Sequence, residues 1–170
     1  MSGSELLLFS VITISGYTDI KERKIYNVIL LPALILALVY QLWVTGLTGL
    51  FYWGQGFILG LALLFIPYLL GGMGAGDVKL LGVIGAIRGP VFVFYCFLAT
   101  AVVGGLLSVG LLLYRRKLTQ AVGNIGSVVQ TVTTYGFLNA KTALPPEDES
   151  TSLPYGLAIA CGAMITYLVI

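Results

Sequence analysis

Uncharged runs of membrane-spanning length follow one another along this chain. Residues 28–44, 50–70 and 91–114 contain no charged side chain. About 20 apolar residues in a helix cross the hydrocarbon core of a bilayer, and helices satisfy their backbone polar groups internally. Charged residues make up 9% of the chain, against about 25% in soluble domains. The sequence therefore predicts an all-α, polytopic membrane helix bundle, with residues 1–170 as one integral-membrane domain.

The number of runs predicts about six transmembrane helices. The fourth run, residues 77–87, spans only about 15 Å as a helix. It therefore either extends through its flanking residues or crosses a thin or water-accessible part of the fold. The expected helices cover approximately residues 5–17, 28–44, 50–70, 77–87, 91–114 and 153–170.

Basic residues predict the orientation of these helices. If the loop after the first run is cytoplasmic, alternate crossings place eight of the nine Lys and Arg residues on that side, and only Arg88 on the other. Such a bias is the positive-inside signal of a cytoplasmic membrane protein. Asp19 ends an inward-running helix and Asp77 begins an outward-running one, so both are expected at the same cytoplasmic depth. The eight residues are Lys21, Arg23, Lys24, Lys79, Arg115, Arg116, Lys117 and Lys141.

A glycine-rich break precedes the fourth run. Its sequence from residue 71 to residue 80 is GGMGAGDVKL, and each glycine would cost about 1 kcal/mol inside a helix relative to alanine. Asp77 follows directly. A carboxylate at the start of a membrane helix is costly and suggests a functional site, whose partner in this topology is Asp19.

Several chemistries are excluded or unsupported by composition. The chain has no histidine, which removes Ser-His and Cys-His dyads and histidine-based zinc sites. Cys96 and Cys161 lie in apolar runs without metal-ligand spacing, so we expect buried cysteines, no metal and no cofactor. Paired aspartates are the main catalytic arrangement that remains.

Two carboxyl groups held close together share one proton, because both cannot be ionised at low cost. The ionised group can activate a water, while the protonated group polarises a peptide carbonyl. Gly74 and Gly76 lack Cβ atoms and are expected to give a peptide backbone room to approach; the alternative is a flexible break between helices. Lys79 could tune the carboxyl pair, but a position facing the lipid headgroups is favoured.

Residues 115–152 are more polar than the rest and are expected in the cytoplasm. Val122, Ile125, Val129 and Val132 recur at helical spacing, which predicts an interfacial amphipathic helix. The acidic stretch at residues 144–152 is interpreted as an exposed loop, with attraction of a basic peptide as the alternative.

Three sequence blocks resemble the type IV prepilin peptidases, which are polytopic aspartic peptidases. Residues 74–77 form a GxGD motif, and residues 19–27 (DIKERKIYN) resemble a second block of the family. Residues 153–160 (LPYGLAIA) resemble a third, particularly in the short members that serve tight-adherence (Flp) pili. The motif positions beyond the two aspartates are Gly74, Gly76, Lys79, Asn27, Pro154, Tyr155 and Gly156.

The resemblance implies cleavage of a short basic leader from prepilins or pseudopilins at the cytoplasmic face, with Asp19 and Asp77 as catalytic residues. The implied partners are these protein substrates and the lipid bilayer, without nucleic acid. Tyr26 stands where the family usually has proline. The chain also lacks the cysteine-rich N-terminal region used for N-methylation, which argues against methyltransferase activity.

Two other classes of function compete with the peptidase. In a small transporter or ion-pathway subunit, Asp19 and Asp77 would be ion or proton sites along a polar path. The third and fifth runs offer few polar residues for such a path. In a membrane scaffold, both charges would be incidental and both aspartates could be replaced.

Overall fold

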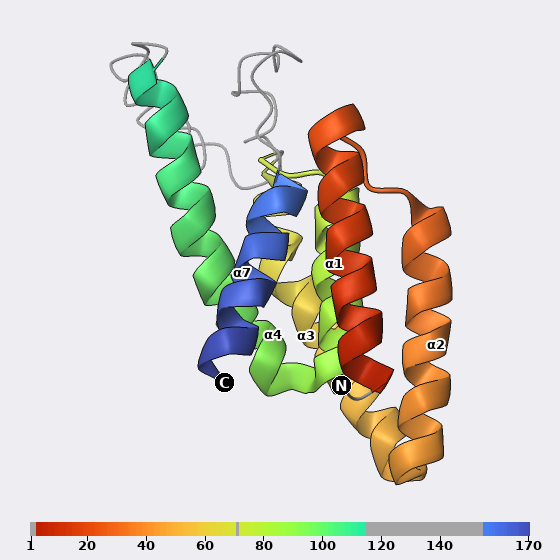
Figure 1. The fold of residues 1–170 in the computed structure, drawn as a ribbon. Helices are drawn as coiled ribbons and strands as arrows, with labels where there is room; N and C mark the ends of the chain where they lie inside the picture. Colours follow the sequence, from red (N-terminus) through yellow and green to blue (C-terminus); the bar gives the residue numbers. More distant parts are fainter. Residues whose placement is uncertain (1–2, 71, 115–154) are drawn as a thin grey trace.

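The computed structural model describes residues 3–70, 72–114 and 155–170. Every regular element in these ranges is a helix, and consecutive segments run up and down in a bundle (Figure 1). Both ends of the chain lie at the lower end of the bundle in this view. The elements are α1 (Gly3–Glu22), α2 (Asn27–Thr45), α3 (Leu47–Leu69), α4 (Ala75–Tyr114) and α7 (Tyr155–Val169).

The long helix α4 is broken at Gly89 and folds back on itself. Gly89 has φ 85° and ψ 179°, a conformation that favours glycine, and it is followed by Pro90. Figure 1 shows the two parts running in opposite directions. We call residues 75–88 the first arm and residues 90–114 the second arm. They correspond to the two separate runs predicted at 77–87 and 91–114.

Side chains from two other helices pair with the carbonyl groups that the break exposes. The Gln41 amide on α2 donates a hydrogen bond to the Ile87 carbonyl at 3.3 Å. The Tyr52 hydroxyl on α3 donates to the Arg88 carbonyl at 2.8 Å. The bond to Ile87 is buried, where an unpaired carbonyl would be costly, and the bond to Arg88 is exposed. Both bonds stabilise the turn between the arms. We call this region the Gly89 end.

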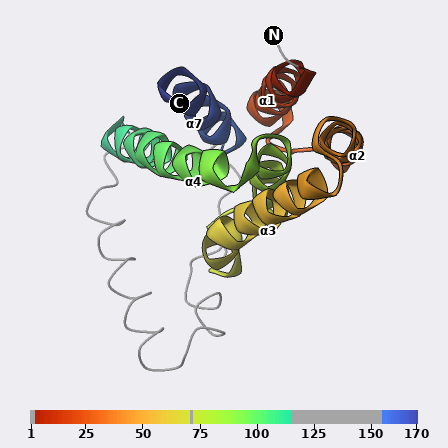
Figure 2. The same cartoon turned by 90° about the horizontal axis from the view of Figure 1, so that it is seen from below.

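The first arm of α4 forms the centre of the bundle. Leu80, Leu81 and Ile84 are fully buried in it, and α4 contacts α1, α2, α3 and α7. Figure 2 shows the first arm among α1, α2 and α3, with the second arm beside α7. Gly56 on α3 and Gly85 on the first arm meet so closely that a Cβ on either would overlap the other's carbonyl. Small residues thus permit the close backbone contact typical of membrane helices.

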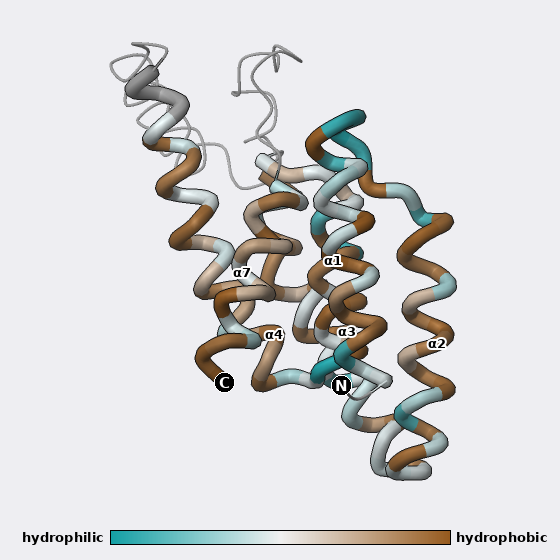
Figure 3. The backbone as a smooth tube through the Cα atoms, viewed as in Figure 1, coloured by the Kyte–Doolittle hydropathy of each residue, from teal (hydrophilic) through white to brown (hydrophobic). Residues whose placement is uncertain are grey.

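Hydrophobic residues dominate the helices, and the most hydrophilic stretch joins α1 to α2 (Figure 3). Helices α2 and α3 and the Ala75–Gly110 part of α4 are each long and apolar enough to cross a membrane, while α7 is a shorter apolar helix. The described part of the chain is therefore all-helical, with the apolar helices of a membrane protein. The count of about six crossings stays a prediction.

The helix bounds differ from the sequence prediction mainly in α1. This helix continues to Glu22, beyond the predicted end at residue 17, so that Asp19 lies inside its last turn. The predicted interfacial helix at 115–152, the acidic loop and Pro154 lie outside the described residues.

Candidate active site

A polar cavity of about 330 Å³ lies where α1 ends and α4 begins. The same end of the bundle carries the first residues of α7 (Figure 1). We call this region the aspartate end. Both aspartates singled out from the sequence line the cavity, together with the link between α1 and α2. Its lining residues are Asp19, Arg23, Lys24, Ile25, Tyr26, Asn27, Gly74, Gly76 and Asp77.

Asp19 is held by the beginning of α7. Its side chain is 5% exposed, and its Oδ2 accepts a hydrogen bond from the Leu157 backbone N–H at 3.1 Å. The Gly156 backbone N–H is a second donor, and the charge of Arg23 also acts on the carboxylate. The first N–H groups of a helix have no partner within it and carry partial positive charge. The start of α7 therefore stabilises a carboxylate at this position.

Gly156 allows this contact because it has no side chain. A Cβ at residue 156 would lie 2.8 Å from Asp19 Oδ2 and 3.0 Å from Asp19 Cβ. Such distances are shorter than van der Waals contact. Any larger residue at this position would displace Asp19 or the start of α7. This crowding explains why glycine is needed at position 156.

Asp77 closes the turn that opens α4. Its Oδ2 accepts a hydrogen bond from the Gly74 N–H at 3.1 Å, and its own N–H donates to the Gly74 carbonyl at 3.2 Å. This reciprocal pairing resembles the capping that satisfies the first N–H groups of a helix. Asp77 is 8% exposed. The GxGD segment thus fixes this carboxyl group beside the cavity.

The two motif glycines make room for neighbours within the chain. A Cβ on Gly74 would lie 3.2 Å from Asp77 Oδ2, and one on Gly76 would lie 3.0 Å from the Ile25 Cβ. Neither glycine has a positive φ. The space beside these two glycines, where the sequence analysis expected a substrate backbone, is thus next to Asp77 and Ile25 in this structure.

The carboxyl groups of Asp19 and Asp77 interact electrostatically. Both line the same cavity, and the negative charge of Asp19 acts on Asp77. Burial and a like charge both disfavour the ionised form of a carboxyl group. Ionising both acids at once is therefore costly here, and the single shared proton stays a prediction of the sequence analysis.

Lys79 does not line the cavity that contains the aspartates. Its Nζ donates a hydrogen bond to Asn27 Oδ1 at 3.2 Å, and Asn27 does line that cavity. Lys79 and Asn27 also border a neighbouring cavity of about 230 Å³ between α2, α3 and the first arm. Tyr155 is the first residue of α7. Two of the motif residues are thus joined to each other, 52 positions apart in sequence.

The backbone donors of α7 escaped the sequence analysis, because an N–H group is present in almost every residue. The link between α1 and α2 contains a further pair that was missed. The Tyr26 hydroxyl donates to Glu22 Oε2, and this bond raises the pKa of Tyr26. Tyr26 has the extended backbone conformation φ −85°, ψ 131° and precedes α2.

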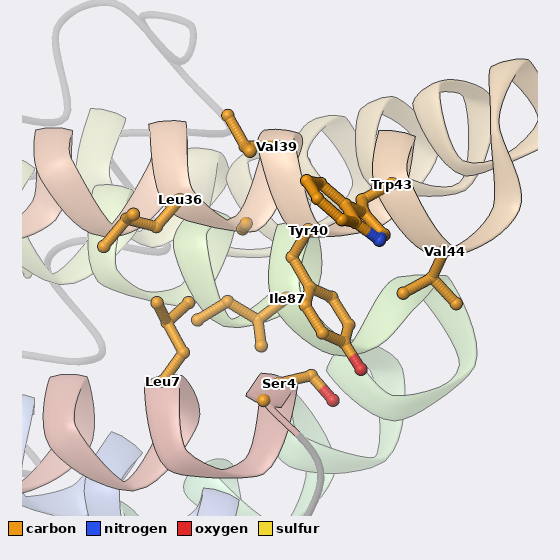
Figure 4. A pocket seen from close by; sticks show the side chains of 10 residues that line it. Ser4, Leu7, Leu36, Val39, Tyr40, Trp43, Val44 and Ile87 are labelled. Atoms are coloured by element: carbon orange, nitrogen blue, oxygen red, sulfur yellow. The ribbon is translucent and has the colours of Figure 1, made fainter.

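Two larger cavities are almost entirely apolar. One of about 530 Å³ lies between α1 and α2, where Leu7, Leu36 and Tyr40 face Ile87 of the first arm (Figure 4). The other, of about 560 Å³, is an open groove between α1 and α7. This α1–α7 groove contains Gly16, Ile20 and Leu157, which are close in sequence to Asp19 or bind it. Neither cavity contains a carboxyl group.

Within the described ranges, no group of three His, Cys, Asp or Glu side chains is arranged to hold a metal ion. Cys96 and Cys161 are both free thiols, of which Cys96 is buried. Among the side chains that line the aspartate cavity, Asp19 and Asp77 are the groups best suited to transfer a proton in the ordinary pH range.

A comparison with protein families matches the part of the chain that contains both aspartates. A model of the type IV leader peptidase family matches residues 6–109, which include both aspartates and the whole GxGD motif. No curated protein and no solved structure gives a significant match. The matched residues are more than half of the chain and contain α2, α3, the first arm and most of α1. The chain belongs to the type IV leader peptidase family.

Proposed function

We propose that this membrane peptidase is an aspartic endopeptidase that removes the short basic leader from type IV (Flp-type) prepilins or pseudopilins. The observation that carries the proposal is the burial of Asp19 and Asp77 on one polar cavity. The family match supports a leader peptidase in general. The excess of basic residues that the sequence predicts on one side supports cleavage at the cytoplasmic face of the inner membrane.

The two aspartates have different surroundings, which suggests different roles. Asp19 accepts hydrogen bonds from two backbone N–H groups and lies near Arg23, whereas one backbone N–H binds Asp77. Hydrogen bonds and positive charge favour the ionised form of a carboxyl group. In the proposed mechanism Asp19 is therefore the carboxylate, and Asp77 holds the shared proton.

Hydrolysis then proceeds in two steps. Asp19 takes a proton from a water whose oxygen bonds to the scissile carbonyl carbon, while Asp77 gives its proton to the carbonyl oxygen. The tetrahedral intermediate collapses when the C–N bond breaks. Asp19 gives the proton that it took from the water to the leaving nitrogen. Asp77 takes a proton back from a hydroxyl of the intermediate as the carbonyl re-forms, so the pair again holds a single proton.

A prepilin also brings an apolar helix that must lie beside the enzyme in the bilayer. The α1–α7 groove begins at Leu157, whose N–H binds Asp19. The cavity shown in Figure 4 instead contains Ser4, Tyr40 and Trp43, at the opposite ends of α1 and α2 from the aspartate end. We therefore assign the substrate helix to the α1–α7 groove, because a helix there would have its cleavage site near the aspartates.

The decisive experiment replaces each aspartate with asparagine, which keeps the shape and removes the acid. Asp19→Asn and Asp77→Asn should each abolish processing of a co-expressed prepilin, measured by the mobility shift of the substrate. Glu5→Gln is the matched control, because it makes the same change at the other end of α1, and it should retain processing. Full processing by either inserted aspartate variant would exclude the mechanism.

A further inference from the structure

Ser15 is an unusual hydroxyl residue in this bundle. Its side chain is fully buried, and its Oγ has no hydrogen-bond partner in the described part of the chain. Other helical hydroxyls donate to the carbonyl four residues earlier, including Ser10, Thr100 and Thr166. Ser15 therefore departs from the usual arrangement at a position where burial makes an unpaired polar group costly.

Asp19 lies one helical turn after Ser15 on the same buried face of α1. Side chains four residues apart on a helix are neighbours, and helical side chains lean toward the N-terminus. By this general tendency, a carboxyl group at position 19 reaches back toward the turn that carries Ser15. One of its oxygens is already fixed by Leu157 of α7, while a carboxylate has about four acceptor sites.

We infer that Ser15 is a positioning residue for Asp19. In the reacting state its hydroxyl donates a hydrogen bond to the Asp19 carboxylate, which is then held from α7 and from its own helix. This inference rests on the proposed role of Asp19 in peptide cleavage, and it assigns Ser15 no contact with the substrate.

The test compares Ser15→Ala with Ser15→Thr in purified enzyme, using a prepilin substrate. Ser15→Ala should lower kcat about 10- to 100-fold with little change in KM, because a hydrogen bond to a charged group is lost near the reacting atoms. Ser15→Thr keeps the hydroxyl and should recover most of kcat. The control is Ser10→Ala, which removes an exposed hydroxyl from the same helix and should leave kcat unchanged.

Thermal unfolding of the same variants separates positioning from a structural role. Ser15→Ala should unfold at the same or a higher temperature than the wild type, because it removes a buried hydroxyl without a partner. A parallel loss of kcat and thermal stability would indicate a structural role and overturn the inference. Full kcat in Ser15→Ala would overturn it while leaving the aspartate mechanism intact. Failure of the wild type to cleave any prepilin would instead refute the proposed function.

Discussion

The aspartate end and the Gly89 end both compensate for a break beside the first arm of α4, but with opposite chemistry. At the Gly89 end, Gln41 and Tyr52 donate hydrogen bonds to two backbone carbonyls. At the aspartate end, Asp19 and Asp77 accept hydrogen bonds from backbone N–H groups. The first arrangement pairs exposed carbonyls with neutral donors. The second places two acids on a cavity.

The difference shows what separates a structural polar group from a reactive one in a membrane protein. Tyr52 has one O–H to donate, and the Arg88 carbonyl receives it. A carboxylate has about four acceptor sites, so one or two backbone bonds fix Asp19 and leave capacity for a water. Hydrogen bonding alone thus does not identify a site. The remaining acceptor capacity beside a cavity is the distinguishing feature.

The largest effect should come from Gly89→Ala. Residue 89 has φ 85°, and a Cβ there would overlap the Tyr52 ring. We expect a loss of about 4 kcal/mol or more in the free energy of unfolding, measured by denaturant titration in detergent. Gly110→Ala is the control, because no atom lies within 4 Å of its Cβ position. Wild-type stability in Gly89→Ala would show that the turn tolerates a side chain.

Gly156→Ala should instead damage activity. The added Cβ would lie 2.8 Å from Asp19 Oδ2, so the carboxylate must move, and small displacements of catalytic groups cost about 100-fold in rate. The measurement is kcat for prepilin cleavage. Gly54→Ala, at an uncrowded position, should behave as wild type. If Gly156→Ala cleaves at the normal rate, the contact between α7 and Asp19 is not needed for catalysis.

Tyr52→Phe should lower stability without changing the chemistry. It leaves the Arg88 carbonyl without the Tyr52 donor in an exposed hydrogen bond, which should cost about 0.5–1.5 kcal/mol in the free energy of unfolding. The cleavage rate of the folded fraction should stay normal. Tyr95→Phe removes the hydroxyl of an exposed tyrosine on the second arm and serves as the control. A large fall in kcat for Tyr52→Phe would mean that the two ends are coupled.

The smallest effect is expected for Lys79→Met. This variant removes the hydrogen bond to Asn27 but no lining residue of the aspartate cavity. Substitutions at exposed positions usually change stability by less than about 0.5 kcal/mol, and we expect kcat within about threefold of wild type, from a steady-state cleavage assay. A fall of about 100-fold would place Lys79 in the catalytic machinery.

Much of the arrangement could be predicted from sequence because the runs between breaks are almost free of charge. Their number and direction predicted that Asp19 and Asp77 lie at one end, and the Gly89-Pro90 pair separated two runs where α4 turns back. The contacts that Gly74 and Gly76 make within the chain could not be predicted from the sequence. Ile25 lies opposite Gly76 only after the link between α1 and α2 has folded over the start of α4.

Backbone contacts between distant segments were beyond sequence reasoning. Leu157 binds Asp19 through its N–H, so its side-chain identity carries no sign of the bond. The unpaired Ser15 hydroxyl likewise looks like any serine in an apolar run until its partners are counted. In both cases the information lies in the relative position of two helices.

The bond between α7 and Asp19 also has a consequence for biosynthesis. Leu157 follows Asp19 by 138 residues, which corresponds to a delay on the order of ten seconds at ordinary translation rates. During that interval α1 can enter the membrane while the partners of its carboxylate have not yet been made. The newly made enzyme should therefore acquire its activity late, when α7 docks, and a nascent chain that stops before α7 should insert but not cleave.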